Sequence, residues 1–136
     1  MEATEHIKTR YNETDQMGII YHANYFNWFT MAREKLFEIS GLKYRALEEE
    51  GIYLPVSEVQ CKYKQSIAYG DEVDVKARLV KFGGVKLRFE YEIWRAGVVI
   101  ATGYTVHGFV DRQLKPIAIE KERPELYTLV HQMLEA

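Results

Sequence analysis

The feature that most constrains the fold is a segment, residues 23–40, whose helical pattern is apolar around most of its circumference. Polar residues recur at helical spacing along a single stripe, made of Asn27, Thr30, Glu34 and Glu38. We expect other elements to enclose this helix, because a surface helix is apolar on one face only. Asn24 is a candidate for the capping residue at its start or for the neighbour of that residue, and Gly41 is a candidate stop at its end.

Beyond a short second helix, predicted over residues 43–50, the period of the apolar residues changes from helical to two. This alternation is typical of antiparallel strands with one buried face. Gly83-Gly84 and Ala96-Gly97 predict hairpin turns, and Pro55 predicts an edge or a bulge where the first of these strands begins. The alternating segments are residues 59–64, 73–79 and 85–93.

The last predicted strand, residues 98–110, is apolar or small at nearly every position. This composition is typical of a strand that is covered on both faces or that meets a partner subunit. We also predict a C-terminal helix from Pro124 and a short first strand over residues 7–11. The elements together predict one α+β domain over residues 1–136, in which a curved antiparallel sheet wraps a long central helix and extends or packs against a partner's sheet.

Composition limits the classes of function. A chain of 136 residues is long enough for one buried core, and a formal net charge of −2 gives no reason to expect a nucleic-acid partner. Cys61 is the single cysteine, so we expect no internal disulfide. The N-terminus lacks the regions of a signal peptide and no apolar run has the length of a transmembrane segment, so a cytoplasmic location is expected.

Asp15 is the first candidate for chemistry. It lies in a predicted turn before Gly18, seven residues ahead of His22. One interpretation is structural, because Asp side chains bond their own backbone in turns. The other is a catalytic carboxylate at the mouth of a pocket beneath the start of the helix. No Ser-His-Asp order, phosphate-binding loop or HExxH motif competes with it.

His22 is the second candidate and also has two interpretations. It is either an ordinary polar residue of the first helical turn or the donor of a backbone N–H that points outward from the helix start. The helix macrodipole there is equivalent to about half a positive charge, which would polarise a substrate carbonyl and stabilise an oxyanion. Tyr11, four residues before Asp15, would face the same site or would be a core or interface tyrosine.

The stretch Tyr11-x-x-x-Asp15-x-x-Gly18-x-x-Tyr21-His22-x-Asn24-Tyr25 resembles the signature of hotdog-fold acyl-CoA thioesterases of the 4-hydroxybenzoyl-CoA thioesterase type. The resemblance is closest to the branch whose bacterial members are associated with the Tol-Pal cell-envelope system. It continues through residues 63–71 and the alternating strands. The family often has proline at the position of Ser66, a difference that concerns a strand bend more than the chemistry.

The resemblance implies a hotdog fold, with dimers that join two sheets into one and commonly pair into tetramers. It places the active site at the dimer interface, near the start of the long helix. It implies that Asp15 is the nucleophile or general base, that His22 and Tyr11 assist, and that the N–H of His22 is the oxyanion donor. Three further motif residues are expected to contact the substrate, namely Tyr21, Asn24 and Tyr25.

No metal and no other cofactor is expected, because a thiolate leaves a thioester readily. The histidines at positions 6, 22, 107 and 131 are too far apart in sequence to indicate a metal site. An apolar tunnel for the acyl chain could be lined by aromatic residues of the helix, each of which is more commonly a core residue. These residues are Tyr25, Phe26, Trp28 and Phe29.

The predicted function is hydrolysis of an acyl-CoA thioester to a free acid and CoA. One alternative is a thioesterase that acts on acyl carrier protein. A hydratase or dehydratase of the same fold is disfavoured, because the helix-borne His and Pro-rich pattern of that branch is missing. The chain could also be an acyl-CoA-binding module without turnover, although Asp15 argues against this by analogy.

Overall fold

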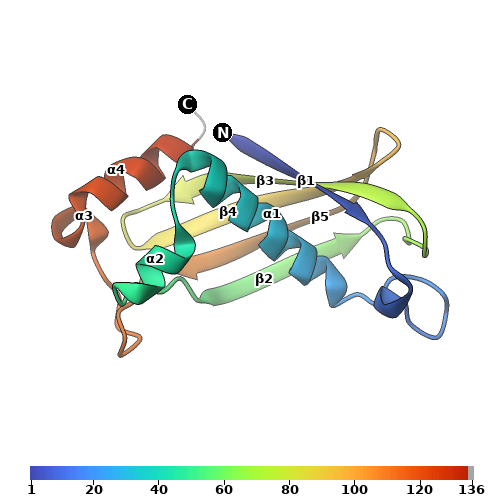
Figure 1. Ribbon diagram of the computed structural model, residues 1–136, viewed down its shortest axis with the longest axis horizontal. Helices are drawn as coiled ribbons and strands as arrows, with labels where there is room; N and C mark the ends of the chain where they lie inside the picture. Colours follow the sequence, from blue (N-terminus) through green and yellow to red (C-terminus); the bar gives the residue numbers. More distant parts are fainter. Residues whose placement is uncertain (135–136) are drawn as a thin grey trace.

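A sheet of five antiparallel strands curves around one long helix in the computed structural model, which describes residues 1–134 (Figure 1). In chain order the elements are β1 (Glu2–Lys8), η1 (Tyr11–Glu13, one turn of 3-10 helix), α1 (Asn24–Ser40), α2 (Tyr44–Glu49), β2 (Val56–Tyr63), β3 (Glu72–Phe82), β4 (Lys86–Arg95), β5 (Val98–Gly108), α3 (Ile119–Glu122) and α4 (Pro124–Met133). This arrangement confirms the predicted α+β class.

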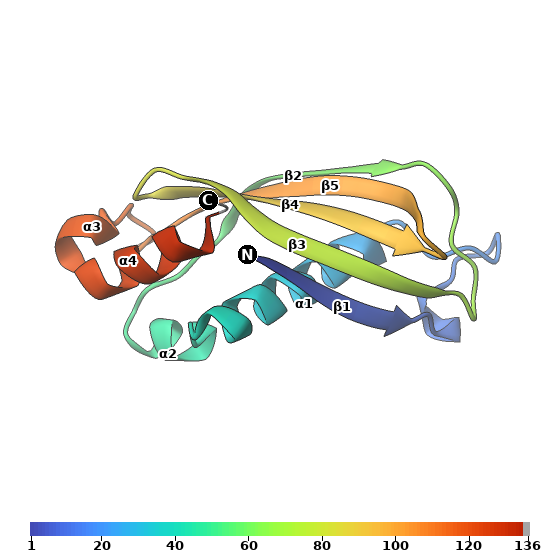
Figure 2. The same ribbon diagram turned by 90° about the horizontal axis from the view of Figure 1, so that it is seen from above.

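The strand order is β1-β3-β4-β5-β2, so β1 and β2 form the two edges of the sheet. Figure 2 shows α1 and α2 on one side of the sheet. Helix α1 packs mainly over β1 and β3. The inner face of β2 is therefore left largely without a helix over it. No helix among residues 1–134 is long and apolar enough to cross a membrane.

The core forms where the apolar arc of α1 meets the inward side chains of the central strands. The ring of Phe29 stacks on Tyr91 with centroids 4.4 Å apart, and Phe37 packs edge-on against Phe89 at 5.6 Å. Because Gly103 of β5 has no side chain, the ring of Phe29 on α1 can pack directly against its backbone. A Cβ atom at Gly103 would lie 2.6 Å from this ring. Burial of these rings is the main source of stability, at roughly 1.5–3 kcal/mol per large apolar side chain.

The helix prediction is confirmed within one residue at its start. Gly41 ends α1 in the left-handed conformation at φ 87°, as expected. Of the two positions predicted for Asn24, the structure shows the neighbour of the capping residue, because Ala23 is the cap and Asn24 is the first helical residue. The side chain of Asn24 donates a hydrogen bond to the carbonyl of Glu13 at 2.9 Å.

Two strand predictions need correction. The first strand covers Glu2–Lys8 rather than residues 7–11, because the chain turns into η1 at Tyr11. The prediction that the strand after Pro55 has one buried face is wrong: Val59 and Tyr63 are 46% and 44% exposed. The reason is that α1 lies over the opposite edge. The predicted edge and bulge are both present, since β2 is an edge strand with a register shift between Val56 and Glu58.

The last strand, β5, is an interior strand that pairs with β4 on one side and β2 on the other. Its inward residues are buried and its outward residues are partly buried. Its apolar composition therefore reflects a central position in the sheet. Of the two edge strands, β2 is the one that α1 leaves uncovered, so it is the edge better placed to meet a partner.

Candidate active site

Asp15 lies in a tight turn between η1 and α1. Its N–H donates to the carbonyl of Ile19 at 2.8 Å, and its carbonyl accepts from the N–H of Gly18 at 3.1 Å. Gly18 has φ 80°, which glycine adopts without strain. Oδ1 of Asp15 accepts a hydrogen bond from the N–H of Met17 at 2.8 Å. Within residues 1–134 the other carboxylate oxygen, Oδ2, has no hydrogen-bond donor, so one oxygen orients the side chain and the second is available for chemistry.

Glu13 attaches this turn to the start of α1. Its carbonyl accepts from the N–H of Tyr21 at 2.8 Å and from the side chain of Asn24 at 2.9 Å. Its buried carboxylate accepts from the N–H of Arg10 at 2.8 Å and from Nε1 of Trp28 at 3.0 Å. Because hydrogen bonds to a charged group are stronger than neutral ones, Glu13 fixes the position of the loop that carries Asp15.

The start of α1 leaves backbone donors unpaired. The N–H groups of Tyr25 and Phe26 donate to the carbonyls of His22 and Ala23 at 3.2 Å. Within the described chain, the N–H groups of His22 and Ala23 have no acceptor. Tyr63 of β2 donates from its hydroxyl to the carbonyl of His22 at 3.2 Å and thereby links the helix start to the sheet.

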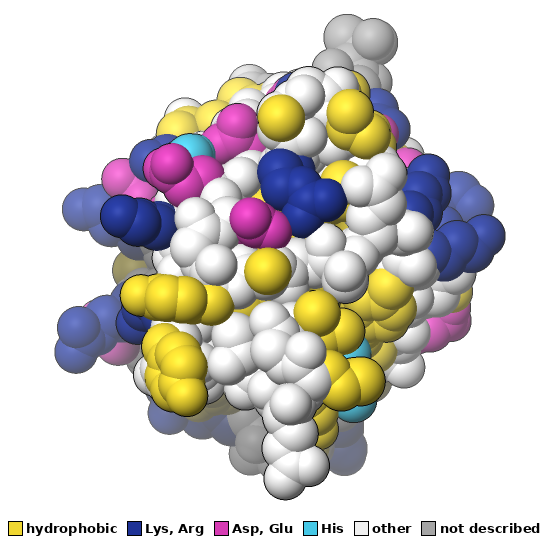
Figure 3. All heavy atoms as spheres, turned by 90° about the vertical axis from the view of Figure 1, so that its right-hand side faces the viewer, with side chains coloured by type: hydrophobic (Ala, Val, Ile, Leu, Met, Phe, Trp, Pro, Cys, Tyr) yellow, Lys and Arg dark blue, Asp and Glu magenta, His cyan; other side chains and the backbone are white. Residues whose placement is uncertain are grey.

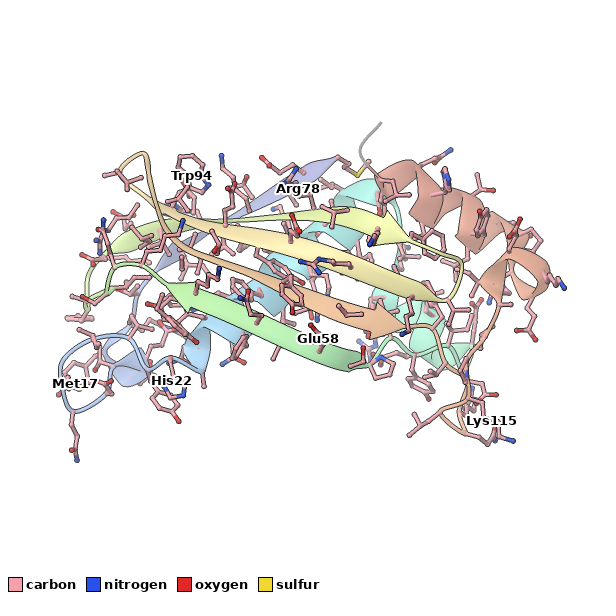
Figure 4. The ribbon with its side chains drawn as sticks, turned by 180° about the vertical axis from the view of Figure 1, so that it is seen from behind. Met17, His22, Glu58, Arg78, Trp94 and Lys115 are labelled. Carbon is pink, nitrogen blue, oxygen red and sulfur yellow. The ribbon has the colours of Figure 1, made fainter. Side chains whose placement is uncertain are left out.

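A cavity of about 320 Å³ lies between this turn, the helix start and the end of β2. Its lining includes Asp15, His22, Tyr25, Tyr63 and Lys64. Asp15 is the only carboxylate among the lining residues. Figure 4 shows His22 at the same end of the molecule as Met17, at the tip of the loop, and Lys115 at the opposite end. The cavity thus combines one carboxylate, one ammonium group and a helix start.

Hydrophobic side chains surround the cavity at this end of the molecule (Figure 3). The exposed ones from the loop, the helix start and β2 with its following segment are Tyr11, Met17, Tyr21, Tyr63 and Tyr69. Burial raises the pKa of Tyr25 and of Tyr63 to about 12, and of the Cys61 thiol to about 11. These three groups are therefore neutral near pH 7, and Asp15, the only carboxylate in the lining, is the candidate nucleophile or base beside the His22 imidazole.

The structure brings together three of the six residues that the sequence motif suggested. Asp15, His22 and Tyr25 line the cavity. Tyr11 is 76% exposed, and its ring contacts Tyr69 edge-on with centroids 5.8 Å apart. Two others lie beside the cavity without lining it: the ring of Tyr21 lies 4.5 Å from that of His22, and Asn24 bonds to Glu13.

Sequence analysis gave no role to Glu13 or Tyr63, and considered Lys64 only as one of several strand cations that either meet the CoA phosphates or are ordinary solvated charges. Tyr63 and Lys64 belong to a stretch that resembled the family without indicating contact with the helix start. Glu13 carried no signal, because a buried carboxylate is recognisable only from its donors on Arg10 and Trp28. Among residues 1–134 no group of three or more His, Cys, Asp or Glu side chains could hold a metal ion.

Comparison with known proteins gives one family. A sequence model of the thioesterase-like superfamily matches residues 9–127. YneP of Bacillus subtilis, provisionally named an acyl-CoA thioesterase, is 36% identical over 124 residues, which is 90% of each chain. The acyl-CoA thioesterase YbgC of Haemophilus influenzae is 26% identical over 118 residues, covering 85% of this chain and 87% of that protein.

Among solved structures, the DHNA-CoA thioesterase of Staphylococcus aureus superimposes with a TM-score of 0.92 at 33% sequence identity. The match covers 96% of this chain and 89% of that one. The curved sheet around a long helix is therefore shared with a thioesterase over nearly the whole chain.

Proposed function

This chain belongs to the thioesterase-like superfamily, and on that basis we propose that it hydrolyses acyl-CoA thioesters to a free acid and CoA at the cavity beside Asp15. One observation carries the proposal. The same cavity is lined by the Asp15 carboxylate, which has a free oxygen, and by His22, whose N–H has no acceptor in the described chain. A carboxylate and a polarising helix start are sufficient for thioester hydrolysis, because a thiolate leaves readily.

The roles follow from these positions. The thioester carbonyl oxygen accepts from the N–H of His22, with the N–H of Ala23 as a second donor that sequence analysis did not name. Asp15 either attacks the carbonyl carbon or takes a proton from an attacking water. In the direct route the C–S bond breaks to give the thiolate of CoA and a mixed anhydride with Asp15, and water then cleaves the anhydride, which releases the acid, a proton and the Asp15 carboxylate. In the water route the C–S bond breaks after water has added, the acid is released, and the proton held by Asp15 passes to the thiolate. Developing negative charge on the carbonyl oxygen is stabilised by the helix start.

The oligomer belongs to the same proposal. Edge strand β2 exposes Val59 and Tyr63 beside the cavity, and unpaired edges with apolar side chains favour pairing with another chain. The active unit is therefore a homodimer or homotetramer in which a second copy covers this edge. The role of Tyr11 and Tyr21, which one chain leaves exposed, depends on that second copy.

Narrower assignments are also part of the proposal. The motif around Asp15 supports the 4-hydroxybenzoyl-CoA thioesterase type and its Tol-Pal-associated branch by resemblance. A cytoplasmic location and an acyl carrier protein as an alternative thiol carrier remain predictions of the sequence. Cell fractionation tests the first, and one carrier-bound substrate in the assay panel tests the second.

The experiment is free-thiol release from acyl-CoAs of different chain length and from benzoyl-CoA, with purified wild type and Asp15→Asn. We expect turnover by the wild type and a loss of about 10²-fold or more in Asp15→Asn, with fold and oligomeric state unchanged. Asp111→Asn is the matched control. Asp111 also accepts backbone hydrogen bonds in a turn, from Gln113 at 2.8 Å, but in the loop of Lys115, at the far end of the molecule (Figure 4). Equal loss in both variants, or binding without turnover in the wild type, would refute the proposal.

A further inference from the structure

A chain of hydrogen bonds with a fixed direction lies on the inner face of the sheet. The carbonyl of Leu54 can only accept, so Nδ1 of His107 donates to it across 3.1 Å. Burial lowers the pKa of His107 to about 4, so the ring is neutral and its Nε2 carries no proton. Nε2 therefore accepts from Oγ1 of Thr105 at 2.8 Å.

The order of donors and acceptors can be followed from Thr105 back to Arg33. The Thr105 hydroxyl gives its hydrogen to His107, so it accepts from Oη of Tyr91 at 2.6 Å. Oη of Tyr91 in turn accepts from Nη1 of Arg33 at 3.0 Å. Each hydrogen along this chain is assigned, and the chain begins at a guanidinium on α1.

Arg33 has donors to spare. A guanidinium carries five N–H groups, and those of Arg33 reach Tyr91 at 3.0 Å and, more weakly, Thr30 at 3.5 Å. The side chain is partly buried, yet within residues 1–134 it forms no ion pair with a carboxylate. The remaining N–H groups of Arg33 have no acceptor among residues 1–134, so they are available to a ligand.

Arg33 lies on the side of α1 that is next to β2. Phe26, Thr30 and Arg33 follow each other at helical spacing and are all partly exposed. The ring of Phe26 packs edge-on against Phe29 at 6.0 Å, and Phe29 touches the backbone of Gly103 where β5 meets β2. This side of α1 is thus a partly exposed stripe along the uncovered edge of the sheet.

The stripe starts at the candidate active site and ends at Arg33. Tyr25 of α1 and Tyr63 of β2 line the cavity with Asp15. Arg33 is eight positions beyond Tyr25, which corresponds to about 12 Å along a helix. On β2, Val59 lies opposite Thr105, a member of the hydrogen-bonded chain. An acyl group that extends from the thioester between α1 and β2 therefore points toward the guanidinium.

From this arrangement we infer that Arg33 is a specificity-determining residue, which binds an oxygen acceptor at the far end of the acyl group. Tyr91, Thr105 and His107 are positioning residues, because their directed hydrogen bonds hold the guanidinium. The substrate class is a CoA thioester whose acyl group carries a carboxylate or hydroxyl oxygen on the order of 10 Å from the thioester carbon. This inference rests on the proposed hydrolysis at Asp15 and specifies the kind of acyl group that the substrate carries.

The test uses matched substrates that differ only in the distal oxygen. Octanoyl-CoA is compared with its ω-carboxyl and ω-hydroxyl derivatives, and 2-naphthoyl-CoA with 6-hydroxy-2-naphthoyl-CoA. We expect wild-type kcat/KM to favour an oxygenated member at least about tenfold, and the carboxyl and hydroxyl arms show which oxygen is preferred. Arg33→Met should reduce the preference to within about twofold, because it lowers kcat/KM for the oxygenated member much more than for the unsubstituted one, whereas Arg33→Lys should restore part of the preference for the carboxylate.

Lys35→Met is the matched control, because it removes one cation from the exposed side of the same helix. It should keep the wild-type preference. Equal wild-type rates for the members of every pair would overturn the inference, as would a preference that survives in Arg33→Met. Dissociation of the Arg33→Met oligomer in sedimentation would also overturn it, because the guanidinium would then serve the partner subunit.

Binding of non-hydrolysable CoA thioethers with the same acyl groups separates this inference from the proposed function. Turnover without any pair preference leaves the hydrolase intact and removes the role of Arg33. Tighter binding of the oxygenated member that depends on Arg33, without turnover of any thioester, supports the role of Arg33 and removes the hydrolase.

Discussion

At the scale of single residues, a neutral histidine inside the fold has a consequence for stability. His107 is 1% exposed on the inner face of β5. Burial, with a further contribution from the charge on Arg33, lowers its pKa from 6.5 to about 4. Between these two pH values the unfolded chain binds a proton at His107 and the folded chain does not. The folded state therefore becomes less stable as the pH falls from 6.5 to about 4.

This difference predicts a specific effect of His107→Gln. At about pH 4.5 the wild type should lose ~2–3 kcal/mol of unfolding free energy at this residue, relative to about pH 7.5. The variant cannot bind this proton, so its unfolding free energy should fall by ~2–3 kcal/mol less than that of the wild type over the same pH change. This difference is expected even if the variant is less stable at neutral pH. Urea unfolding of both proteins at the two pH values measures this. Parallel losses would mean that His107 is not kept neutral by the fold.

At the scale of elements, the contact between α1 and β5 depends on a missing side chain. A Cβ atom at Gly103 would lie 2.5 Å from the carbonyl oxygen of Gln60 and 2.6 Å from the ring of Phe29. The first neighbour is backbone of β2 and the second is a fully buried ring, so neither can move without disturbing its own contacts.

Gly103→Ala should therefore lower the unfolding free energy by about 1–3 kcal/mol, the usual cost of overpacking a core. Gly83→Ala is the matched control, since a Cβ atom there meets nothing within 4 Å and the backbone has no positive φ. Its effect should stay within about 0.5 kcal/mol. Denaturant titration of both variants provides the comparison, and equal stabilities would contradict the packing described for α1.

The elements also mark the limit of what could be predicted from sequence. Helix α1 could be predicted closely, because its wide apolar arc and Gly41 are local signals. The exposure of β2 could not, because its alternating pattern is that of a buried face and only the position of α1 over β1 and β3 leaves it bare.

At the site, the motif pointed to Asp15, His22 and Tyr25, which line one cavity. It gave no indication of Glu13 or Tyr63, because their roles consist of contacts between segments distant in sequence. A family motif can identify which residues belong to the site. The hydrogen bonds that hold those residues in place can be found only from the three-dimensional structure.

At the scale of the whole molecule, edge strand β2 is the proposed interface between copies. Val59 is 46% exposed on this strand, and a lysine on an edge strand discourages pairing between chains. Val59→Lys should shift the protein toward monomers in sedimentation velocity at micromolar concentration. Val98→Lys is the matched control, because Val98 is 50% exposed but lies in the hairpin between β4 and β5. If Val59→Lys remains associated like the control, β2 is not the interface.

The strand order also has a consequence for how the chain is made. On the ribosome, β3 and β4 can pair as soon as they have been synthesised, whereas the nascent β2 strand, Val56–Tyr63, has to wait for Val98–Gly108, its pairing partner among the described strands. Until Gly108 emerges, β2 is an unpaired strand with apolar side chains at alternate positions, and unpaired strand edges favour misassembly on a growing chain. The segment proposed to complete the enzyme between two copies is thus also exposed to misassembly during synthesis.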